Sequence, residues 1–368
     1  MTGADAAGGA DRLVHRKGEH IAAALETGDV GGAGWDDVTL VHDALPGTDL
    51  DQIGLGTEFL GRRIGLPLVI SGMTGGHPDS VAINAELAKA AAATGAMIGV
   101  GSQRAALRRG DSRRASSYAV VREQAPDAFV FANIGIAQLI DQHDEAAVTV
   151  DDALAAVDMV RADALAVHLN YLEELVQPEG QTRARGARAA LARLAAELPV
   201  PVVAKETGAG LSRDVALRLR DLGVRALDVG GRGGTSFAAI EARRAAARGD
   251  ALRAAAGLAL RDWGIPAAAS TGLCAGVLPV IASGGVRDGL DAARALSLGA
   301  AAVGVGRPLL EQALLRAGAA LQWIERFAYQ LRAAVFLAGV TSVAGLPEAS
   351  RIVGGHTRWW LDEMGGRP

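Results

Sequence analysis

The sequence predicts an α/β protein built as a closed (β/α)8 barrel. From residue 66 onward, short apolar segments alternate with helical patterns, and strands are expected at 66–71, 96–101, 128–134, 164–170, 200–206, 226–231, 280–285 and 301–306. Continuous apolar strands separated by helices are typical of a parallel sheet that helices cover. Eight such units predict a closed barrel. An open doubly wound sheet should carry Gly-x-Gly-x-x-Gly after its first strand, and residues 71–76 lack that spacing.

The remaining segments suggest the organisation of the chain. Helical patterns fall at 79–94, 139–160, 186–198 and 212–222, and the Arg- and Ala-rich segment 238–260 is expected to be one helix, either an excursion or an oligomer contact. Residues 35–60 show no clear period and are expected to cover one end of the fold. The segment 309–337 predicts one or two amphipathic helices that close the barrel or pack against a neighbouring subunit, and we favour a core role. The expected parts are a disordered N-terminus (1–15), one barrel domain (16–340) and a C-terminal tail (341–368).

Composition narrows the class of protein. Half of the 368 residues are hydrophobic, and the net charge of −4 gives no reason to expect a nucleic acid as partner. Cys274 is the single cysteine, which excludes an internal disulfide and a thiolate metal cluster. No apolar run reaches the ~18 residues of a membrane span, and the N-terminus lacks the apolar core of a signal peptide. These features favour a soluble, cytoplasmic protein.

The segment after the fourth strand is dense in reactive side chains. His168, Asn170, Glu173 and Glu174 follow the apolar run 164–167. Charged groups are rarely buried without a partner, and active sites of barrels lie at the C-terminal ends of the strands. The alternative is a solvated loop followed by a helix whose acidic first turn suits its dipole. Because nearly every other strand also ends in polar or glycine residues, we favour a ligand-filled barrel mouth.

Two further patterns predict phosphate binding. Glycine-rich turns follow the seventh and eighth strands, with Arg287 and Arg307 nearby, and glycine lets backbone N–H groups approach phosphate oxygens closely. Near the N-terminus, Arg16 and Lys17 with His20 can hold a phosphate; an ordinary basic helix start is the alternative there.

Lys205 ends the fifth strand and is expected to point into the mouth. A lysine beside an aromatic cofactor would stabilise negative charge on its ring. The alternative for Lys205 is a salt bridge to Glu206 or Glu174.

A series of short segments, in order from residue 16 to about 310, resembles the type 2 isopentenyl diphosphate isomerases. They are Arg16-Lys17-x-Glu19-His20, 71–76 (SGMTGG), 100–104 (VGSQR), 132–135 (ANIG), 168–170 (HLN), 178–180 (PEG), 205–208 (KETG), 233–236 (GGTS) and 282–287 (ASGGVR). The resemblance implies a (β/α)8 barrel that binds flavin mononucleotide (FMN), requires the reduced flavin and Mg²⁺, and interconverts isopentenyl and dimethylallyl diphosphate without net redox change. It also implies NADPH as the reductant and a homo-oligomer, a tetramer or octamer.

The same resemblance implies roles for individual residues. Around FMN and its phosphate it places Gly72, Met73, Thr74, Ser102, Asn133, Lys205, Thr235, Gly284, Gly285, Arg287, Gly306 and Arg307. Toward the prenyl diphosphate substrate it places Arg16, Lys17, His20, Gln103, Arg104 and Asn170. Glu173 and His168 would be catalytic, and Glu174 would hold Mg²⁺ in the way a carboxylate and phosphate oxygens usually do.

The chain departs from the family pattern in the opening stretch. Glu173 stands where the family has Gln, and Gln181, Thr182 and Ala184 replace Asp, Arg and an aromatic residue. A neutral amide cannot usefully release a proton near neutral pH, whereas a carboxyl group can. Neighbouring anions disfavour the charged form of Glu173 and raise its pKa, while Mg²⁺ opposes this.

Three enzymatic hypotheses follow. In the first, the protein is an isomerase in which Glu173 orients or shuttles. In the second, it is a paralogue in terpenoid biosynthesis in which Glu173 protonates and cyclises a longer prenyl chain, with Ala184 leaving room. The third is an FMN-dependent 2-hydroxy-acid oxidoreductase, which would need a His–Arg pair near the flavin; His356 is the only late histidine. A flavin-binding protein without catalysis is the remaining possibility.

Overall fold

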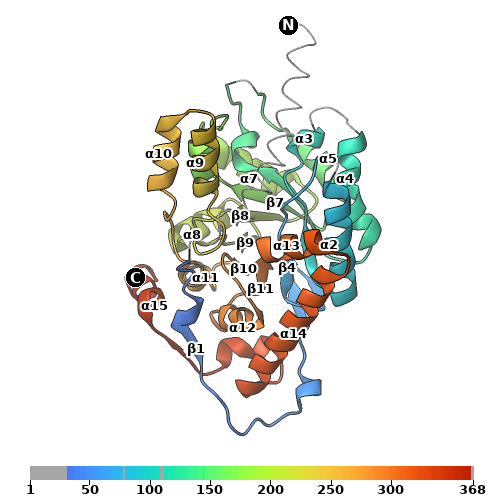
Figure 1. Cartoon of the computed structure of the whole chain (residues 1–368), viewed down its shortest axis with the longest axis vertical. Helices are drawn as coiled ribbons and strands as arrows, with labels where there is room; N and C mark the ends of the chain where they lie inside the picture. Colours follow the sequence, from blue (N-terminus) through green and yellow to red (C-terminus); the bar gives the residue numbers. More distant parts are fainter. Residues whose placement is uncertain (1–30, 78, 108–111, 144, 366–368) are drawn as a thin grey trace.

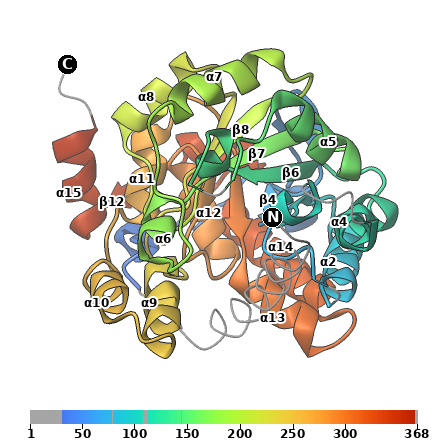
Figure 2. The same cartoon turned by 90° about the horizontal axis from the view of Figure 1, so that it is seen from above.

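The computed structural model describes residues 31–77, 79–107, 112–143 and 145–365, and its centre is a closed parallel barrel. The strand order around the barrel is β10-β11-β4-β5-β6-β7-β8-β9, and helices surround it (Figures 1 and 2). The barrel strands are β4 (Leu68–Ile70), β5 (Met97–Gly99), β6 (Val130–Gly135), β7 (Ala164–Leu169), β8 (Val202–Glu206), β9 (Ala226–Asp228), β10 (Val280–Ser283) and β11 (Ala302–Val305). Each falls within or largely overlaps a predicted strand, so the (β/α)8 prediction is confirmed.

The helices cover the outside of the barrel because its strands are buried on both faces. They are α2 (Ser80–Thr94), α3 (Arg104–Leu107), α4 (Ser112–Gln124), α5 (Val150–Val160), α6 (Tyr171–Val176), α7 (Ala187–Glu197), α8 (Arg213–Asp221), α9 (Phe237–Ala247), α10 (Ala251–Ala259), α11 (Ala267–Cys274), α12 (Gly289–Ser297), α13 (Arg307–Leu315) and α14 (Ala319–Leu337). Within the described ranges, no helix is both long and apolar enough to cross a membrane.

Two helix predictions were wrong in their extent. The helix expected over 139–160 starts only at Val150, because Thr149 caps it by accepting a hydrogen bond from the backbone N–H of Asp152. The single helix expected over 238–260 is two helices, α9 and α10. Gly249 adopts a left-handed φ of 76°, and the Asp250 side chain caps α10. These two helices pack against each other and against α6.

The N-terminal end of the barrel is closed by a hairpin that begins in the segment 35–60, expected to cover one end, and extends to residue 64. Strands β2 (Thr57–Phe59) and β3 (Arg62–Ile64) pair antiparallel. Phe59 is buried, and its ring lies 5.7 Å from that of Phe129 and 6.1 Å from that of Phe131 in edge-on contacts. The inward side chains of the strands and this hairpin form one apolar cluster. Apolar side chains therefore fill the barrel interior at this end, and a ligand can enter only at the C-terminal end of the strands.

The C-terminal residues also form regular structure. Strand β12 (Arg351–Val353) pairs antiparallel with β1 (Val38–Leu40), and α15 (Gly355–Met364) packs on α11. The Asp37 carboxylate accepts a hydrogen bond from the backbone N–H of Thr357. The segment 309–337 is two helices, of which α14 packs against α2 and α12 with Trp323 and Phe327 buried, so its core role is confirmed.

Candidate active site

The alternation of side chains along the strands builds the floor of the site. In a strand, every second residue faces the same way. The inward series is apolar below, as with Val203 and Ala226, and becomes polar at the C-terminal ends. A narrow cavity on the barrel axis is lined there by Ser71, Gly72, Asn133, Lys205 and Asp228, together with apolar side chains beneath them.

Lys205 and Asp228 form the charged pair of this cavity. They are register partners on β8 and β9, and Lys205 Nζ donates to Asp228 Oδ2 at 2.7 Å. The Ser283 hydroxyl donates to the other oxygen of Asp228 and itself accepts the backbone N–H of Gly230 at 3.0 Å. A salt bridge of Lys205 was one predicted alternative, but its predicted partners, Glu206 and Glu174, are wrong. The reason is strand alternation, which points Lys205 inward and its neighbour outward.

Glu206 performs a different task on the outer side of β8. Its Oε2 accepts backbone N–H groups of Gly208, Ala209 and Gly210 at 2.6, 2.5 and 3.0 Å. Burial raises the pKa of Glu206 to about 7, although these hydrogen bonds oppose the shift. The carboxylate thereby holds the loop that follows Lys205.

Asn133 and His168 are joined on neighbouring strands. Asn133 Nδ2 donates to the Val100 carbonyl at 3.0 Å, so its Oδ1 accepts the Nδ1–H of His168 at 2.8 Å. Nδ1 therefore carries a proton, and the neutral and charged forms of the histidine differ only at Nε2. Gln103 lies behind them, fully buried. Its amide accepts the Asn133 N–H and donates to the Ala156 carbonyl, so it supports the strand ends and does not reach the mouth where substrate contact was predicted.

Asn170 holds the two adjacent carboxylates of α6. Its Nδ2 lies 3.1 Å from Glu173 Oε2 and 3.1 Å from Glu174 Oε1. Glu174 is 6% exposed, and its other oxygen accepts the backbone N–H of Gln181 at 2.7 Å. No Lys or Arg among the described residues forms an ion pair with Glu174. Asn170 Oδ1 is buried without a hydrogen-bond partner in the same part of the chain. Such an arrangement is costly unless a cation or another donor is added.

The Pro178-Glu179-Gly180 turn folds back beneath α6. A Cβ on Gly180 would lie 1.7 Å from the Glu174 carbonyl oxygen, so only glycine permits this approach. Glu179 is bound by Arg244 of α9 and by Arg248, which follows that helix, each at 2.9 Å. Burial alone would raise the pKa of Glu179, but these two cations outweigh it and lower the pKa to about 2. The excursion formed by α9 and α10 therefore anchors the turn that lies beneath α6 and its two carboxylates.

Arg104, predicted to face a diphosphate, begins α3 at the same end of the barrel. It pairs with Glu145, whose Oε2 also accepts the Gln181 side-chain amide at 2.6 Å. Sequence reasoning missed Glu145, because nothing in its loop distinguishes it from other acidic surface residues. It also missed Asp228, which the inward alternation from Ala226 would have revealed.

The predicted phosphate turns have the expected backbone. Gly284 and Gly285 adopt left-handed φ values of 107° and 65°, and Trp35 Nε1 donates to the Gly284 carbonyl at 3.0 Å. Gly306 precedes α13 without a side-chain cap, and its carbonyl accepts the backbone N–H groups of Leu309 and Leu310 at 3.0 and 3.2 Å. Met73 lies against this turn, since a Cβ on Gly306 would be 3.5 Å from its sulfur.

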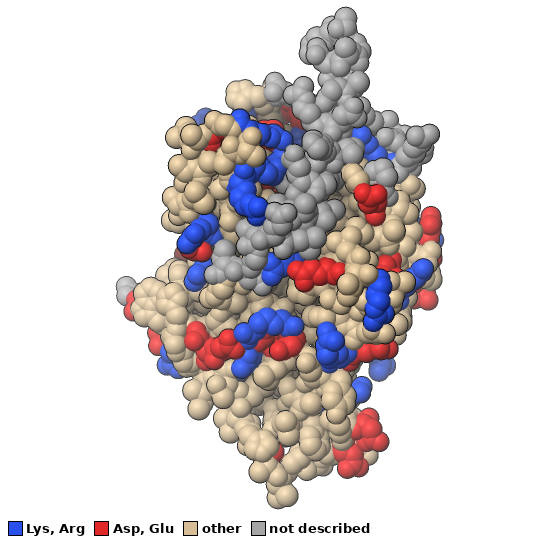
Figure 3. All heavy atoms as spheres, viewed as in Figure 1, with Lys and Arg blue, Asp and Glu red and all other residues tan. Residues whose placement is uncertain are grey.

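Arg287, predicted to lie near the FMN phosphate, is paired with two carboxylates. Its guanidinium donates to Asp291 and Asp36 through Nε and both terminal nitrogens, at 2.7–2.9 Å. These hydrogen bonds, first that of Asp291, raise its pKa, and four of its five donors are used. The pair network extends to Arg294. Figure 3 shows acidic and basic side chains interleaved in a band across one face, as such networks require.

The other predicted residues are placed as follows. The Thr74 hydroxyl is buried against Asn84, Gly72 packs on the Val100 backbone, and the Ser102 carbonyl accepts the Tyr118 hydroxyl. The Thr235 carbonyl lies near Gly208, and Arg307 pairs with Glu311 at 3.5 Å. Arg16, Lys17 and His20 lie outside the described residues.

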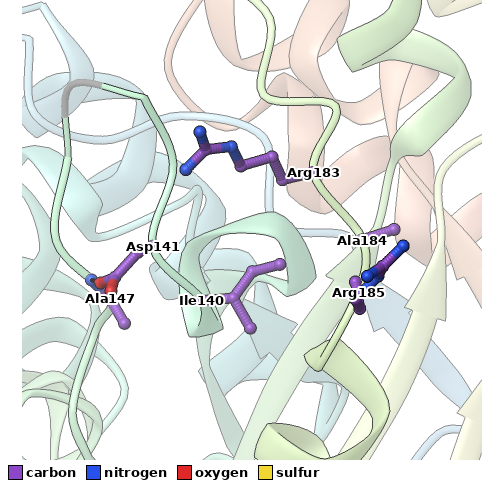
Figure 4. Close-up of a pocket in the computed structure, with 6 residues that line it drawn as sticks. All are labelled: Ile140, Asp141, Ala147, Arg183, Ala184 and Arg185. Carbon is purple, nitrogen blue, oxygen red and sulfur yellow. Dashed lines mark hydrogen bonds between the residues drawn. The ribbon is translucent and has the colours of Figure 1, made fainter.

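A second hollow, of about 610 Å³, opens beside the mouth between the loops after β6 and α6 (Figure 4). It is lined by Ile140, Asp141, Ala147, Arg183, Ala184 and Arg185. The Tyr171 hydroxyl and the Gln142 amide both donate to the Arg183 carbonyl, which ties this hollow to α6.

Comparisons with known proteins agree with this geometry. Two solved structures of mandelate oxidase share the fold, with TM-scores of 0.58 and 0.57 at 21% and 20% identity; they cover 95% and 87% of this chain, and 98% and 90% of their own chains are matched. A family model described as FMN-dependent dehydrogenase matches residues 173–352.

Sequence relatives are more specific. The isopentenyl-diphosphate delta-isomerase of Archaeoglobus fulgidus is 44% identical over 351 residues, 95% of this chain and 99% of that protein. That of Halobacterium salinarum is 44% identical over 350 residues, 95% of this chain and 96% of that protein. Matches of this extent establish the family: the chain belongs to the type 2 isopentenyl-diphosphate delta-isomerases.

Proposed function

We propose that the protein is an FMN- and Mg²⁺-dependent enzyme that isomerises isopentenyl diphosphate to dimethylallyl diphosphate. The names of the relatives and the flavin family model support the reaction and the cofactor. The observation that carries the proposal for this chain is the link from Asn170 to both Glu173 and Glu174 at the edge of the mouth. It brings a potential proton carrier and a metal-binding carboxylate together.

The residues of the mouth fit a flavin. The axial cavity offers an amide at Asn133 and a cation at Lys205 above apolar walls, which suits a flat ring with polar edges. The glycine turn at Gly284 and Gly285, with its left-handed backbone, suits the phosphate, because glycine lets backbone N–H groups approach the oxygens closely. Once bound, the reduced flavin would supply an electron-rich ring against which positive charge on a substrate is stabilised.

The carboxylate pair fits Mg²⁺. The described segments contain no group of three or more His, Cys, Asp or Glu side chains that could hold a metal alone. A hard dication held by Glu174, with the remaining positions filled by diphosphate oxygens and water, matches the usual chemistry of Mg²⁺. The unpartnered Oδ1 of Asn170 adds a neutral oxygen beside it.

The isomerisation adds a proton to the terminal alkene carbon and removes another from the methylene carbon bonded to the internal alkene carbon, so protons balance and no electrons are transferred. Glu173 holds or moves a proton at its carboxyl oxygens, and Asn170 fixes the orientation of that group. His168 is oriented by its Nδ1–H, which donates to Asn133, and would contact the diphosphate through Nε2. Asp228 holds the Lys205 ammonium group in place at the wall of the cavity.

The test is product analysis with purified protein, FMN, NADPH, Mg²⁺ and isopentenyl diphosphate. We expect dimethylallyl diphosphate only when FMN, the reductant and the metal are all present. In Glu174→Gln, the Mg²⁺ concentration needed for half-maximal rate should rise at least about tenfold, because the metal loses its charged ligand. Size-exclusion chromatography with light scattering checks the expected tetramer or octamer.

A paralogue acting on a longer prenyl diphosphate is the second candidate. The hollow beside Ala184 and the carboxyl group of Glu173 favour it. Conversion of geranylgeranyl diphosphate, but not isopentenyl diphosphate, to a cyclic product would establish it. A 2-hydroxy-acid oxidoreductase lacks comparable support, since His356 lies on α15 stacked on Trp359 and does not line the axial cavity. Oxygen consumption with mandelate would revive it.

A further inference from the structure

We infer that Asp228 is a positioning residue for Lys205, and that this pair sets the charge which the barrel presents to the flavin ring. The inference rests on the proposed FMN site and goes beyond it, because it concerns what tunes the reduction potential of the bound flavin. Asp228 lies outside the sequence segments that resemble the family. Its role is inferred from the geometry alone.

The pair is built into the barrel wall. Lys205 and Asp228 are register partners, and their side chains meet at 2.7 Å on the axial cavity. The Lys205 side chain is 18% exposed and that of Asp228 only 5%. The carboxylate therefore lies on the protein side and the ammonium group on the cavity side. A lysine on a flexible stem is held in one place by this contact.

A second contact fixes the carboxylate itself. Ser283, on the next strand, donates to Asp228 Oδ1, and its hydroxyl oxygen accepts the Gly230 backbone N–H. Three neighbouring strands, β8, β9 and β10, thus supply a continuous chain of hydrogen bonds. Each oxygen of Asp228 is used, so the carboxylate cannot rotate away without leaving a buried charge unpaired.

The charges of Lys205 and Asp228 determine how the pair acts on the flavin. With both members present the pair is neutral overall, and the flavin faces a dipole whose positive end is nearer. Reduction of a flavin places negative charge on the ring, and nearby fixed charges act strongly in a partly buried site. Removing the Asp228 charge should stabilise the reduced flavin, whereas removing the Lys205 charge should destabilise it. Removing both should restore the balance.

The experiment is a spectroelectrochemical titration of the FMN-loaded protein and its variants. In Asp228→Asn we expect the reduced form to gain about tenfold in stability, a rise of about 30 mV in midpoint potential for a two-electron couple. Lys205→Gln should shift it downward by a similar factor. The double variant should lie close to the wild type, which a merely structural role of Asp228 would not produce.

Asp163→Asn is the matched control. Asp163 also forms hydrogen-bonded ion pairs, with Arg62 and Arg122, but it precedes β7 at the closed end of the barrel. Asp163 lies roughly 15–20 Å along the strand from the mouth. We therefore expect the midpoint potential of FMN in Asp163→Asn to equal that in the wild type, even if the stability of the protein falls.

The outcomes separate the two proposals. A wild-type protein that takes up no FMN refutes the proposed function and this inference together. Bound FMN with an unchanged potential in Asp228→Asn, or a double variant no closer to the wild type than the single, overturns the inference alone. Should Asp228→Asn fail to fold, Lys205→Gln is compared with the double variant, which leaves no unpaired buried charge. The double must then have the higher potential.

Discussion

At Glu173 the chain carries an ionisable carboxyl group where the family pattern has an amide. Its oxygen contacts the same Asn170 amide that holds Glu174. Both a carboxyl group and an amide can accept this hydrogen bond, so orientation survives either residue. Only the carboxyl group can also deliver a proton. The role of the Glu173 side chain therefore distinguishes an isomerase from a paralogue that acts on a longer chain.

Glu173→Gln separates these roles. If Glu173 orients, as the proposed isomerase function implies, the variant should keep isopentenyl diphosphate isomerisation within about tenfold, measured as kcat/KM. If Glu173 is an obligatory acid, the loss should reach about 10²–10⁴-fold, the usual contribution of general acid catalysis. A loss of activity in Glu173→Gln with the longer prenyl diphosphate only would favour the paralogue.

Glu206 predicts a pH dependence of stability. Its pKa rises from 4.5 to about 7 on folding because it is buried. Below pH 4.5 both states are protonated, and as the pH rises toward 7 the unfolded state ionises first, so stability falls across this window. The full shift corresponds to at most about 3.5 kcal/mol, at about 1.4 kcal/mol for each pKa unit.

In Glu206→Gln, urea unfolding at pH 5 and pH 7.5 should give more similar free energies than in the wild type. Asp250→Asn serves as control, since Asp250 caps α10 at the surface. An undiminished loss of stability between the two pH values in Glu206→Gln would show that another group titrates there.

The sequence carried much of this residue-scale information, but unevenly. His168, Asn170, Lys205 and the glycine turns are visible because polar residues interrupt apolar strands. Asp228 sits in an equally apolar strand and was overlooked, although its alternation with Ala226 marks it as inward. The Glu145 pairing with Arg104 joins residues 41 apart in the chain. No local pattern encodes such a contact.

At the scale of elements, strand positions were predictable and helix boundaries were not. An apolar run flanked by glycine leaves few alternatives to a buried strand. The helix expected from residue 139 fails because a cap at Thr149 competes with ten residues of weak apolar spacing. Gly249 and Asp250 likewise end one helix and begin another. Caps are short-range chemistry that overrides a longer pattern.

The hairpin of β2 and β3 closes the barrel and can be tested by Phe59→Ala. Phe59 is 1% exposed and contacts two phenylalanine rings, so its removal should cost about 3–5 kcal/mol of unfolding free energy. Leu45→Ala, at an 88% exposed position, should change stability by no more than about 0.5 kcal/mol. Equal, small effects in urea unfolding would mean that the hairpin is not part of the barrel core.

At the scale of the whole molecule, one end of the barrel is packed and the other is polar. Every second residue of a strand faces inward, and along this inward series apolar residues lie at the closed end whereas Lys205 and Asp228 lie at the mouth. The excursion of α9 and α10 extends the architecture by fixing the Glu179 loop beneath the carboxylates. The predicted substrate residues near the N-terminus lie outside the described chain.

The most direct measurement is NMR of the reaction in deuterated water, with the protein loaded with reduced FMN and Mg²⁺ and supplied with isopentenyl diphosphate. Dimethylallyl diphosphate carrying solvent deuterium, formed with no net change in the flavin absorption spectrum, is the predicted result. A fully flavin-loaded, reduced protein that leaves isopentenyl diphosphate unchanged would contradict the account.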